Sequence, residues 1–282
     1  MNATSPVGRA PGAEPAFLRL SRFLERRIGI VLGPEREYLA HHRLGPVLAA
    51  FGLRDLDSLV LALERQPASA LLDAVIDAMT THETLWFRDR YPFDVLTSRV
   101  LPERWLPGHH LRVWSAACST GQEAYSLAIT LEEYLQHQPR LRGATYDILG
   151  TDVSAAALAV ADAGLYDAQN GVRGLSPAQL ARYFERQRGG HALRPVWRRG
   201  VNFRRFNLLD DPAGLGSFDL IFLRNVLIYF QADAQQRLLE RVAACLAPGA
   251  TLVLGTAETL TTRHGVLAPR RLDGGVIYQR QS

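Results

Sequence analysis

Apolar residues recur at two different spacings along the chain, and the change of spacing divides it into two parts. From Ala16 to Met79 they return every three or four positions, in stretches that Gly and Pro interrupt. That period is typical of amphipathic helices, so we expect a bundle of about four short helices in residues 16–80. Residues 1–15 are rich in Pro, Gly, Ala and Ser without any period, which predicts a disordered tail.

From Leu111 onward, short apolar runs alternate with helical patterns. Strands are expected at residues 111–114, 146–149, 201–206, 218–223, 251–254 and 275–280. Helices are expected between them, one beginning after Gly121, one capped by Ser154 and one capped by an Asp233–Gln236 box. Such alternation predicts an α/β fold over residues 111–282, with a doubly wound parallel sheet that binds ligands at the carboxyl ends of its strands.

Two further segments belong to neither pattern. Residues 81–110 are expected to be a linker with a connecting helix between the bundle and the α/β domain. About residues 164–200 form an insertion, with a helix capped by Ser176 and a basic segment from His191 to Arg199 that predicts a small antiparallel ribbon. The insertion either extends the rim of the ligand site or covers an edge of the sheet.

Composition narrows the possible functions. A chain of 282 residues, 47% apolar, has room for one large and one small domain. No apolar run approaches the roughly 18 to 20 residues that span a bilayer, and the N-terminus lacks the apolar segment of a signal peptide, so we expect no membrane insertion and a cytoplasmic location. The two cysteines, Cys118 and Cys245, lie far apart, which predicts reduced thiols and no metal site. The net charge of +4 rests on arginines spread along the whole chain, and we expect no nucleic acid partner.

Polar groups follow several of the predicted strands at their carboxyl ends. The small residues from Ser115 to Gly121 form a loop that lets a ligand approach the backbone, without the GxGxxG or GK[ST] patterns of dinucleotide and triphosphate sites. Glu123 suits a ligand with an amino group, and Asp152 can accept from ribose hydroxyls. With the Asn207–Leu208 turn at an adenine edge, and Arg224-Asn225 after the next strand, these groups fit S-adenosylmethionine.

The chain resembles the chemotaxis-receptor glutamate O-methyltransferases, the CheR family, over about residues 16–260. The resemblance rests on six stretches in the same order and spacing: TTHETLWFRD (80–89), VWSAACSTGQEAYSLAI (113–129), GTDVS (150–154), LSPAQLARYF (175–184), FNLLD (206–210) and FDLIFLRNVLIYF (218–230). It implies a Rossmann-like class I methyltransferase domain behind a small all-α domain, with S-adenosyl-L-methionine as cofactor and S-adenosyl-L-homocysteine as product. The segment around TTHETLWFRDRYPF is similar to the PilK-like branch that serves pilus-type chemosensory systems.

The resemblance also implies roles for individual residues. Arg88 and Tyr229 would flank the transferred methyl group as the catalytic residues. The implied cofactor-binding residues are His82, Thr84, Arg88, Ala116, Glu123, Asp152, Asn207, Leu208, Arg224 and Asn225. The sequence departs from the family pattern at His82, where Asn is usual, at Trp86, where Phe is usual, and at Gln122, which replaces an acid.

The implied reaction is methyl transfer to glutamate side chains on the cytoplasmic helices of methyl-accepting receptors, by an enzyme expected to be a monomer. A glutamate with a pKa near 4.3 is already ionised at neutral pH, so no general base is required and the enzyme must mainly supply position. Two alternatives stay open on the sequence: a receptor-docking module with reduced catalysis, and a methyltransferase for RNA or a small molecule. The less basic surface around His41 and the short insertion favour receptor recognition without a tethering tail peptide.

Overall fold

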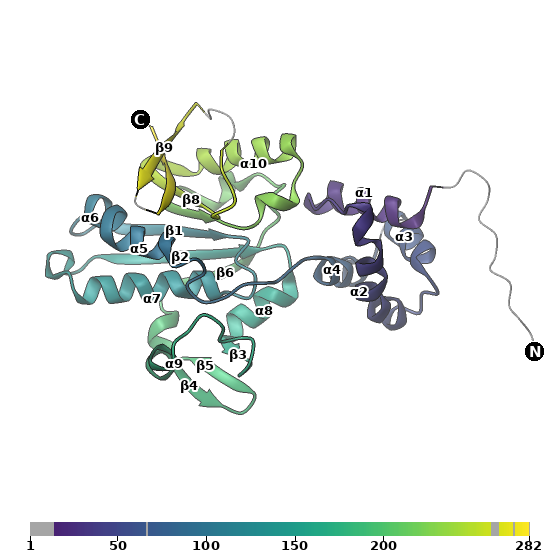
Figure 1. The fold of residues 1–282 in the computed structure, drawn as a ribbon, viewed down its shortest axis with the longest axis horizontal. Helices are drawn as coiled ribbons and strands as arrows, with labels where there is room; N and C mark the ends of the chain where they lie inside the picture. Colours follow the sequence, from purple (N-terminus) through teal and green to yellow (C-terminus); the bar gives the residue numbers. More distant parts are fainter. Residues whose placement is uncertain (1–13, 66, 261–264, 273, 282) are drawn as a thin grey trace, which may run out of the picture. The chain divides into compact units, whose positions relative to one another are not determined.

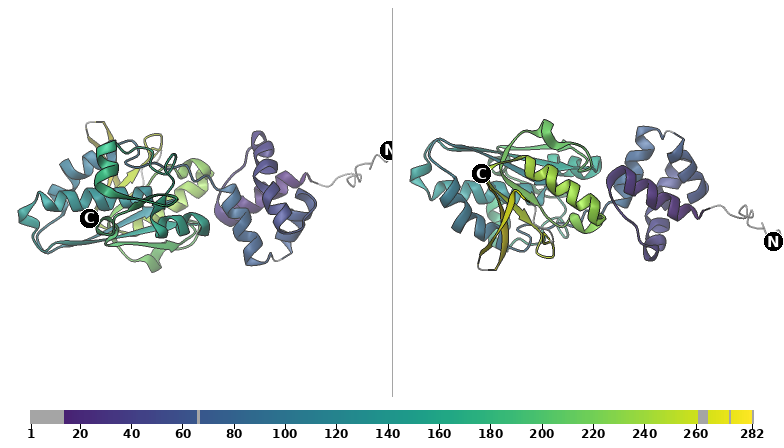
Figure 2. Two further views of the ribbon diagram at one scale, coloured as in Figure 1. Left: turned by 90° about the horizontal axis from the view of Figure 1, so that it is seen from below. Right: turned by 90° about the horizontal axis from the view of Figure 1, so that it is seen from above.

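The computed structural model describes residues 14–65, 67–260, 265–272 and 274–281. The chain divides into two compact units, Met1–Met79 and Thr80–Ser282 (Figures 1 and 2). Apart from Glu14 and Pro15, the tail predicted for residues 1–15 lies outside the described residues. Within the described ranges, no helix combines the length and the apolar character that crossing a bilayer requires.

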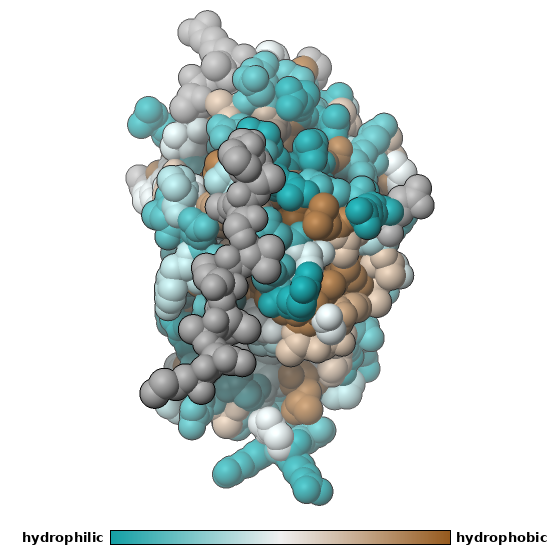
Figure 3. All heavy atoms as spheres, turned by 90° about the vertical axis from the view of Figure 1, so that its right-hand side faces the viewer, coloured by the Kyte–Doolittle hydropathy of each residue, from teal (hydrophilic) through white to brown (hydrophobic). Residues whose placement is uncertain are grey.

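The first unit is the predicted bundle of short helices. Its helices are α1 (Ala16–Ile28), α2 (Glu37–Ala50), α3 (Leu56–Glu64) and α4 (Ser69–Met79), with a 3-10 turn η1 (Pro34–Arg36) before α2. Leu20, Leu24 and Leu44 are completely buried between these helices, as their periodic spacing predicts. Figure 3 faces this unit and shows apolar residues interspersed among polar ones on its surface.

A seven-stranded sheet forms the centre of the second unit (Figure 1). Its strands are β1 (His110–Ala116), β2 (Thr145–Asp152), β6 (Val201–Arg205), β7 (Phe218–Leu223), β8 (Leu246–Leu254), β9 (Leu267–Leu272) and β10 (Gly275–Arg280). The order is β6-β2-β1-β7-β8-β10-β9, with β6, β2, β1, β7 and β8 parallel and β10 antiparallel to both of its neighbours. The doubly wound α/β fold is therefore confirmed, and the order reverses between β1 and β7, where such sheets bind ligands.

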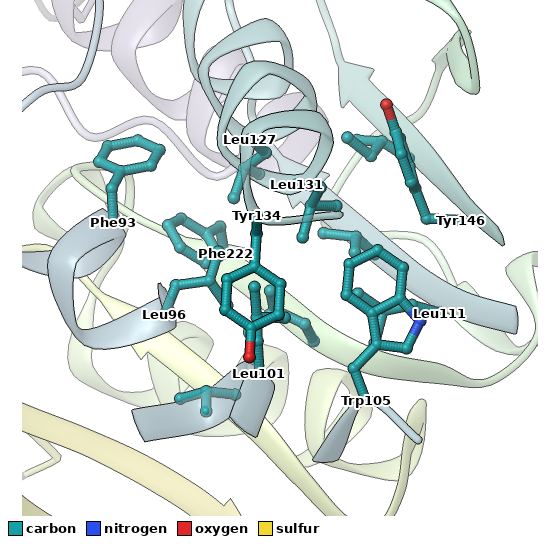
Figure 4. Close-up of a cluster of buried hydrophobic side chains, with 14 of the residues drawn as sticks. Phe93, Leu96, Leu101, Trp105, Leu111, Leu127, Leu131, Tyr134, Tyr146 and Phe222 are labelled. Atoms are coloured by element: carbon teal, nitrogen blue, oxygen red, sulfur yellow. The ribbon is translucent and has the colours of Figure 1, made fainter. Parts of the chain in front are cut away.

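Alternate residues of β1 face the two covering layers. Leu111 and Val113 pack against α7 (Gln122–Gln136) and the segment α5 (Tyr91–Val95), η2 (Leu96–Val100) and α6 (Leu101–Arg104), in the cluster drawn in Figure 4. Trp114 and Ala116 pack on the opposite face, in a cluster that includes α10 (Ala232–Ala244). Burial on both faces explains why the parallel strands read as nearly continuous apolar runs.

The insertion after β2 folds as its own small unit of structure. It follows α8 (Ala155–Ala163), which Ser154 caps as predicted, and contains β3 (Leu165–Tyr166), α9 (Pro177–Tyr183), β4 (Phe184–Gln187) and β5 (Gly190–Leu193). The predicted capping box of Ser176 and Gln179 is present at α9. The predicted small antiparallel ribbon is present as β4 and β5, but only His191 to Leu193 of the segment predicted for it belong to it. Pro195 has no amide to pair, and Pro195–Arg198 forms the 3-10 turn η4.

Two other predictions near the C-terminus were wrong in detail. The Asp233–Gln236 box is absent, because α10 begins at Ala232 with Gln231 as its N-cap, and the Gln236 side chain donates to Glu240 instead (3.1 Å). The strand predicted at residues 251–254 begins earlier, at Leu246, so that Pro248 and Gly249 lie inside β8. The remaining 3-10 turns are η3 (Pro139–Leu141), η5 (Pro212–Leu215) and η6 (Leu227–Tyr229).

Candidate active site

The loop between β1 and α7 turns sharply beside the carboxyl end of β2. Ala117, Ser119 and Gly121 all have left-handed φ angles, of 59°, 52° and 91°. A Cβ at Gly121 would lie 2.8 Å from the Cβ of Ala161, so glycine alone fits where α7 begins. The Cys118 amide donates to the Thr151 carbonyl of β2 (2.8 Å), which holds the loop against the strand end.

Asp152 ends β2 and is nearly buried beneath this loop. One carboxylate oxygen accepts from the Ser119 amide (2.8 Å) and the other from the Ser154 amide (2.9 Å). Burial raises the pKa of Asp152 above its ordinary value, while the two amides and the nearby His82 act in the opposite direction. A carboxylate has about four acceptor sites, and main-chain amides do not fill all of them, so Asp152 can still accept from a ribose hydroxyl.

Glu123 and Arg224 form a buried ion pair across the point where the strand order reverses. Nη1 of Arg224 lies 2.9 Å from Oε2 of Glu123, and the Ser115 hydroxyl donates to the other Glu123 oxygen (2.7 Å). The Arg224 side chain is 1% exposed and the Glu123 side chain 13%. Nη2 of Arg224 donates to the Arg88 carbonyl (2.9 Å) and to Asp89 (2.8 Å). Arg224 therefore joins the end of β7 to both the first turn of α7 and the linker.

The linker before α5 is fixed to the α/β unit on two sides. Trp86 is completely buried; its amide donates to the Arg173 carbonyl (3.0 Å) and its indole to the Gly171 carbonyl (2.8 Å), both in the insertion. On the other side, the Phe87 amide donates to the Ser126 hydroxyl of α7 (3.0 Å). The half-buried side chain of Arg88 thus extends from an anchored main chain and donates to the Glu83 carbonyl (3.2 Å).

Two further predicted residues, His82 and Thr84, lie on this linker, and His82 contacts the β1 loop. The His82 carbonyl accepts from the Ser119 hydroxyl (3.2 Å), and its ring lies 2.9 Å from the Thr80 hydroxyl. Thr84 is half-buried two residues farther along. Because Ser119 also donates to Asp152, His82 and Asp152 share one hydrogen-bonded connection.

Asn207 and Leu208 follow β6 beside Asp152. The preceding Phe206 amide donates to the Asp152 carbonyl (3.0 Å), which holds the turn next to the end of β2. Within the turn, the Asn207 side chain accepts from the Leu209 amide (3.1 Å), and Leu208 is buried.

The segment after β7 carries Asn225 and Tyr229. Asn225 has a left-handed φ of 57°, and Tyr229 ends the 3-10 turn η6 in a half-buried position. The remaining predicted residue, Ala116, ends β1 and is paired with β2 and β7 on its two sides. The structure thus places Ala116, Asp152, Asn207 and Arg224 at or just after strand ends, and it links Glu123, Arg224 and the Arg88 main chain in one network.

Three residues of this region were not predicted from the sequence: Asp89, Ser119 and Glu258. Asp89 pairs with Arg224 and accepts from the Thr256 hydroxyl (3.0 Å). Glu258 is buried and accepts from main-chain amides after β7 and β8. Its position just beyond the carboxyl end of β8 is the signal that could have found it, since polar residues at strand ends had marked the rest of the site.

The polar groups present fit an S-adenosylmethionine molecule. Glu123 offers a carboxylate for an ammonium group, and Asp152 offers acceptors for ribose hydroxyls. Among the described residues, the buried Nε of Arg224 has no hydrogen-bond partner, so one buried donor is available for a carboxylate. Groups suited to the amino acid end and to the ribose of the cofactor therefore lie beside neighbouring strands.

Comparison with known proteins gives the same assignment. Residues 82–273 match the family model described as CheR methyltransferase, SAM binding domain, and residues 15–80 match CheR methyltransferase, all-alpha domain. The chain is 43% identical over 266 residues to "Chemotaxis protein methyltransferase Cher2" of Pseudomonas putida, which covers 93% of this chain and 97% of the relative. It is 44% identical over 260 residues to "Chemotaxis protein methyltransferase 1" of Pseudomonas aeruginosa, covering 91% and 94%.

Among solved structures, the magnesium protoporphyrin IX methyltransferase of Synechocystis PCC 6803 matches 97% of this chain and 100% of its own, at 12% identity and a TM-score of 0.41, which is too low to support an assignment. The two family models and the relatives suffice. The chain belongs to the CheR methyltransferase family and is a methyltransferase that uses S-adenosyl-L-methionine.

Proposed function

We propose that this member of the CheR methyltransferase family transfers a methyl group from S-adenosyl-L-methionine to glutamate side chains of methyl-accepting chemotaxis receptors, forming methyl esters. The names of the relatives support chemotaxis receptors as the substrate class. The observation that carries the proposal is the network around Arg224, which ties Glu123 in the first turn of α7 to the linker that presents Arg88. One buried guanidinium thus couples the proposed cofactor side to the proposed acceptor side.

The cofactor is held, in this proposal, by residues at four strand ends and on the linker. Glu123 binds the ammonium group, Arg224 and Asn225 the carboxylate end, and Asp152 the ribose hydroxyls. The adenosine end lies against His82, Ala116 and the Asn207–Leu208 turn, with Thr84 and Arg88 closing the site from the linker. The buried donor at Arg224 Nε and the nearly buried carboxylate of Asp152 at the end of β2 support these roles.

The chemistry requires little beyond orientation and exclusion of water. The cofactor supplies an electrophilic methyl group on a positively charged sulfur. Arg88 holds the acceptor carboxylate by charge-assisted hydrogen bonds, and Tyr229 donates a hydrogen bond to the same group. No proton has to be removed, because the acceptor glutamate is ionised at neutral pH. Holding both reactants in a near-attack arrangement is worth effective molarities of about 10⁵ to 10⁸ M.

Receptor recognition falls to parts of the chain outside the sheet. We assign the helical domain, residues 16–80, and the insertion, about residues 164–200, to contacts with the cytoplasmic helices of the receptor. The linker and connecting helix span 81–110, and residues 111–282 form the cofactor-binding domain. The enzyme acts as a cytoplasmic monomer in this scheme. Pull-down with receptor tails that keep or lack their terminal residues tests whether a tail peptide is needed for binding.

The decisive experiment measures ester formation directly. The purified protein, labelled cofactor and receptor-containing membranes should yield base-labile methyl label on the receptor. Arg88→Ala should abolish this label while S-adenosylhomocysteine binding, measured by calorimetry, falls by less than about tenfold. Cofactor binding without ester label on any cognate receptor would refute glutamate methylation and leave the family assignment intact.

A further inference from the structure

Glu258 occupies an unusual position for a buried carboxylate, because its hydrogen-bond partners within the described ranges are all main-chain amides. The residue is 7% exposed and follows β8 by a tight turn, in which its own amide donates to the Gly255 carbonyl (2.8 Å). Oε2 accepts from the amides of Asn225 (2.7 Å) and Gly255 (2.9 Å), and Oε1 accepts from the amide of Leu227 (2.8 Å). The carboxylate therefore bridges the ends of two neighbouring parallel strands.

Those amides belong to the segment that carries Tyr229. Asn225 lies in the left-handed region, a conformation that is unfavourable for most residues and persists only where the surroundings impose it. Because Asn225 and Leu227 donate to opposite oxygens of one carboxylate, the curvature of the chain between them is fixed. Tyr229 follows two residues later, and its amide closes the 3-10 turn on the Val226 carbonyl (3.2 Å).

The carbonyl side of the same segment is held by a second side chain. Nε2 of Gln235, in the first turns of α10, donates to the carbonyls of Leu227 (2.9 Å) and Phe230 (3.0 Å). The segment between β7 and α10 is thus held through its amides by Glu258 and through its carbonyls by Gln235. The side chain of Ile228, by contrast, is 59% exposed, so apolar packing at that position does not anchor the turn.

The end of β8 is shaped to admit this carboxylate. A Cβ at Gly255 would lie 2.6 Å from Oε2 of Glu258 and 2.9 Å from the Asn225 nitrogen. Both are closer than real Cβ contacts, so any side chain at Gly255 would displace the carboxylate or the Asn225 main chain. Glycine at position 255 therefore leaves the space that the carboxylate of Glu258, three residues later, occupies.

We infer that Glu258 is a positioning residue for methyl transfer, which sets the place of Tyr229 by fixing the main chain from Asn225 to Leu227. This inference rests on the proposed role of Tyr229. Displacement of a positioned group by about 1 Å can cost about 100-fold in rate, even when the change lies away from the reacting atoms. Glu258 itself touches neither reactant in this assignment.

The test is a double-mutant cycle with Tyr229, measured at saturating cofactor. Glu258→Gln keeps the size of the side chain but turns one acceptor into a donor that faces a main-chain amide. We expect turnover to fall about 10- to 100-fold with a smaller change in KM for the receptor. The same substitution in a Tyr229→Phe background should cost less than about threefold, because the group that Glu258 positions is already removed.

Controls separate this role from general destabilisation. Glu240→Gln, the same chemical change on the exposed face of α10, should leave turnover and thermal stability unchanged. Gly255→Ala should reproduce the loss of Glu258→Gln through a different residue. If Glu258→Gln does not yield folded protein, Glu258→Asp, which keeps both acceptors but shortens their reach, takes its place in the cycle.

The outcomes distinguish the positioning role of Glu258 from the proposed role of Tyr229. Wild-type turnover in Glu258→Gln, or an equal loss with and without the Tyr229 hydroxyl, overturns the inference about Glu258 alone. Wild-type turnover in Tyr229→Phe overturns the proposed role of Tyr229 instead. Receptor methylation by the unaltered protein would stand in either case.

Discussion

Replacing Glu123 by Gln tests the centre of the proposed cofactor site. The substitution keeps the shape of the side chain but removes its charge, and it offers Arg224 a neutral group in place of a carboxylate. In the structure, Glu123 accepts from Ser115 (2.7 Å) and from Arg224 (2.9 Å), whose side chain is only 1% exposed. Of the described residues, Arg224 would keep only Asp89 as a counter-charge, and the Asp89 side chain is 35% exposed.

The expected cost follows from the burial of this pair. Hydrogen bonds to charged groups are worth about 1.5 to 3 kcal/mol, and Asp89 limits the penalty to that range by keeping one partner for Arg224. For a unit of about 200 residues, each kcal/mol lowers the melting temperature by about 2 to 4 °C, so we expect a fall of about 3 to 12 °C. Loss of a charge-assisted contact to the cofactor ammonium should weaken S-adenosylhomocysteine binding about 10- to 150-fold.

Both quantities can be measured on one preparation. Thermal unfolding followed by circular dichroism gives the stability change, and calorimetric titration with S-adenosylhomocysteine gives the affinity. Glu240→Gln is the matched control, because Glu240 is exposed and contacts only a neighbouring glutamine side chain in the described part of the chain. Affinity within about twofold of the unaltered protein would refute the assignment of Glu123 to the ammonium group, whatever happened to stability.

Three other outcomes follow from the structure. Burial raises the pKa of Asp152 above its ordinary 3.8, so the ionised Asp152 opposes folding at neutral pH; this penalty shrinks as pH falls below the raised pKa and is gone only below 3.8, the pKa in the unfolded chain. S-adenosylhomocysteine affinity should be lost as pH falls through the raised pKa, and Asp152→Asn should flatten that pH profile; an unchanged profile would contradict the role. Trp86→Ala should destabilise the protein by about 3 to 5 kcal/mol and Trp86→Phe by less, measured by chemical unfolding, because the ring is completely buried; equal stabilities would count against the anchored linker. Cys118 and Cys245 are both buried, and burial raises the pKa of both thiols, so a thiol reagent should modify them only after denaturation. Modification of Cys118 in the folded protein would show that the β1 loop opens.

Much of the fold could be predicted because periodic burial and helix caps depend on residues that are close together in the sequence. The helices of residues 16–79 and the parallel strands follow from periodic burial, and the caps at Ser154 and Ser176 follow from side chains that reach only three residues along the chain. The same logic failed at Asp233, where the spacing matched a capping box. There Gln235 binds the carbonyls of Leu227 and Phe230, and the helix begins earlier, at Ala232.

In the candidate site, too, some residues could be predicted from the sequence and others could not. Glu123 and Asp152 could be predicted because each follows a strand that apolar patterning reveals. The partners of Asp89 and Glu258 could not be predicted, because Arg224 lies 135 residues beyond Asp89 and the partners of Glu258 are main-chain amides, which every residue except proline carries. β9 was missed because its exposed, arginine-containing edge lacks a clear alternating pattern.

The bridges around Arg224 also have a consequence for how the protein folds. Arg224 reaches Glu123 and Asp89 across 101 and 135 residues of chain, and β1, β7 and β8 must all be in place before these groups can meet. Contacts at such separations require the closure of long loops, so they form late in folding. A ligand of this site therefore binds only the completed sheet, and the thermal shift it causes reports the unfolding of the whole α/β unit rather than local ordering of a loop.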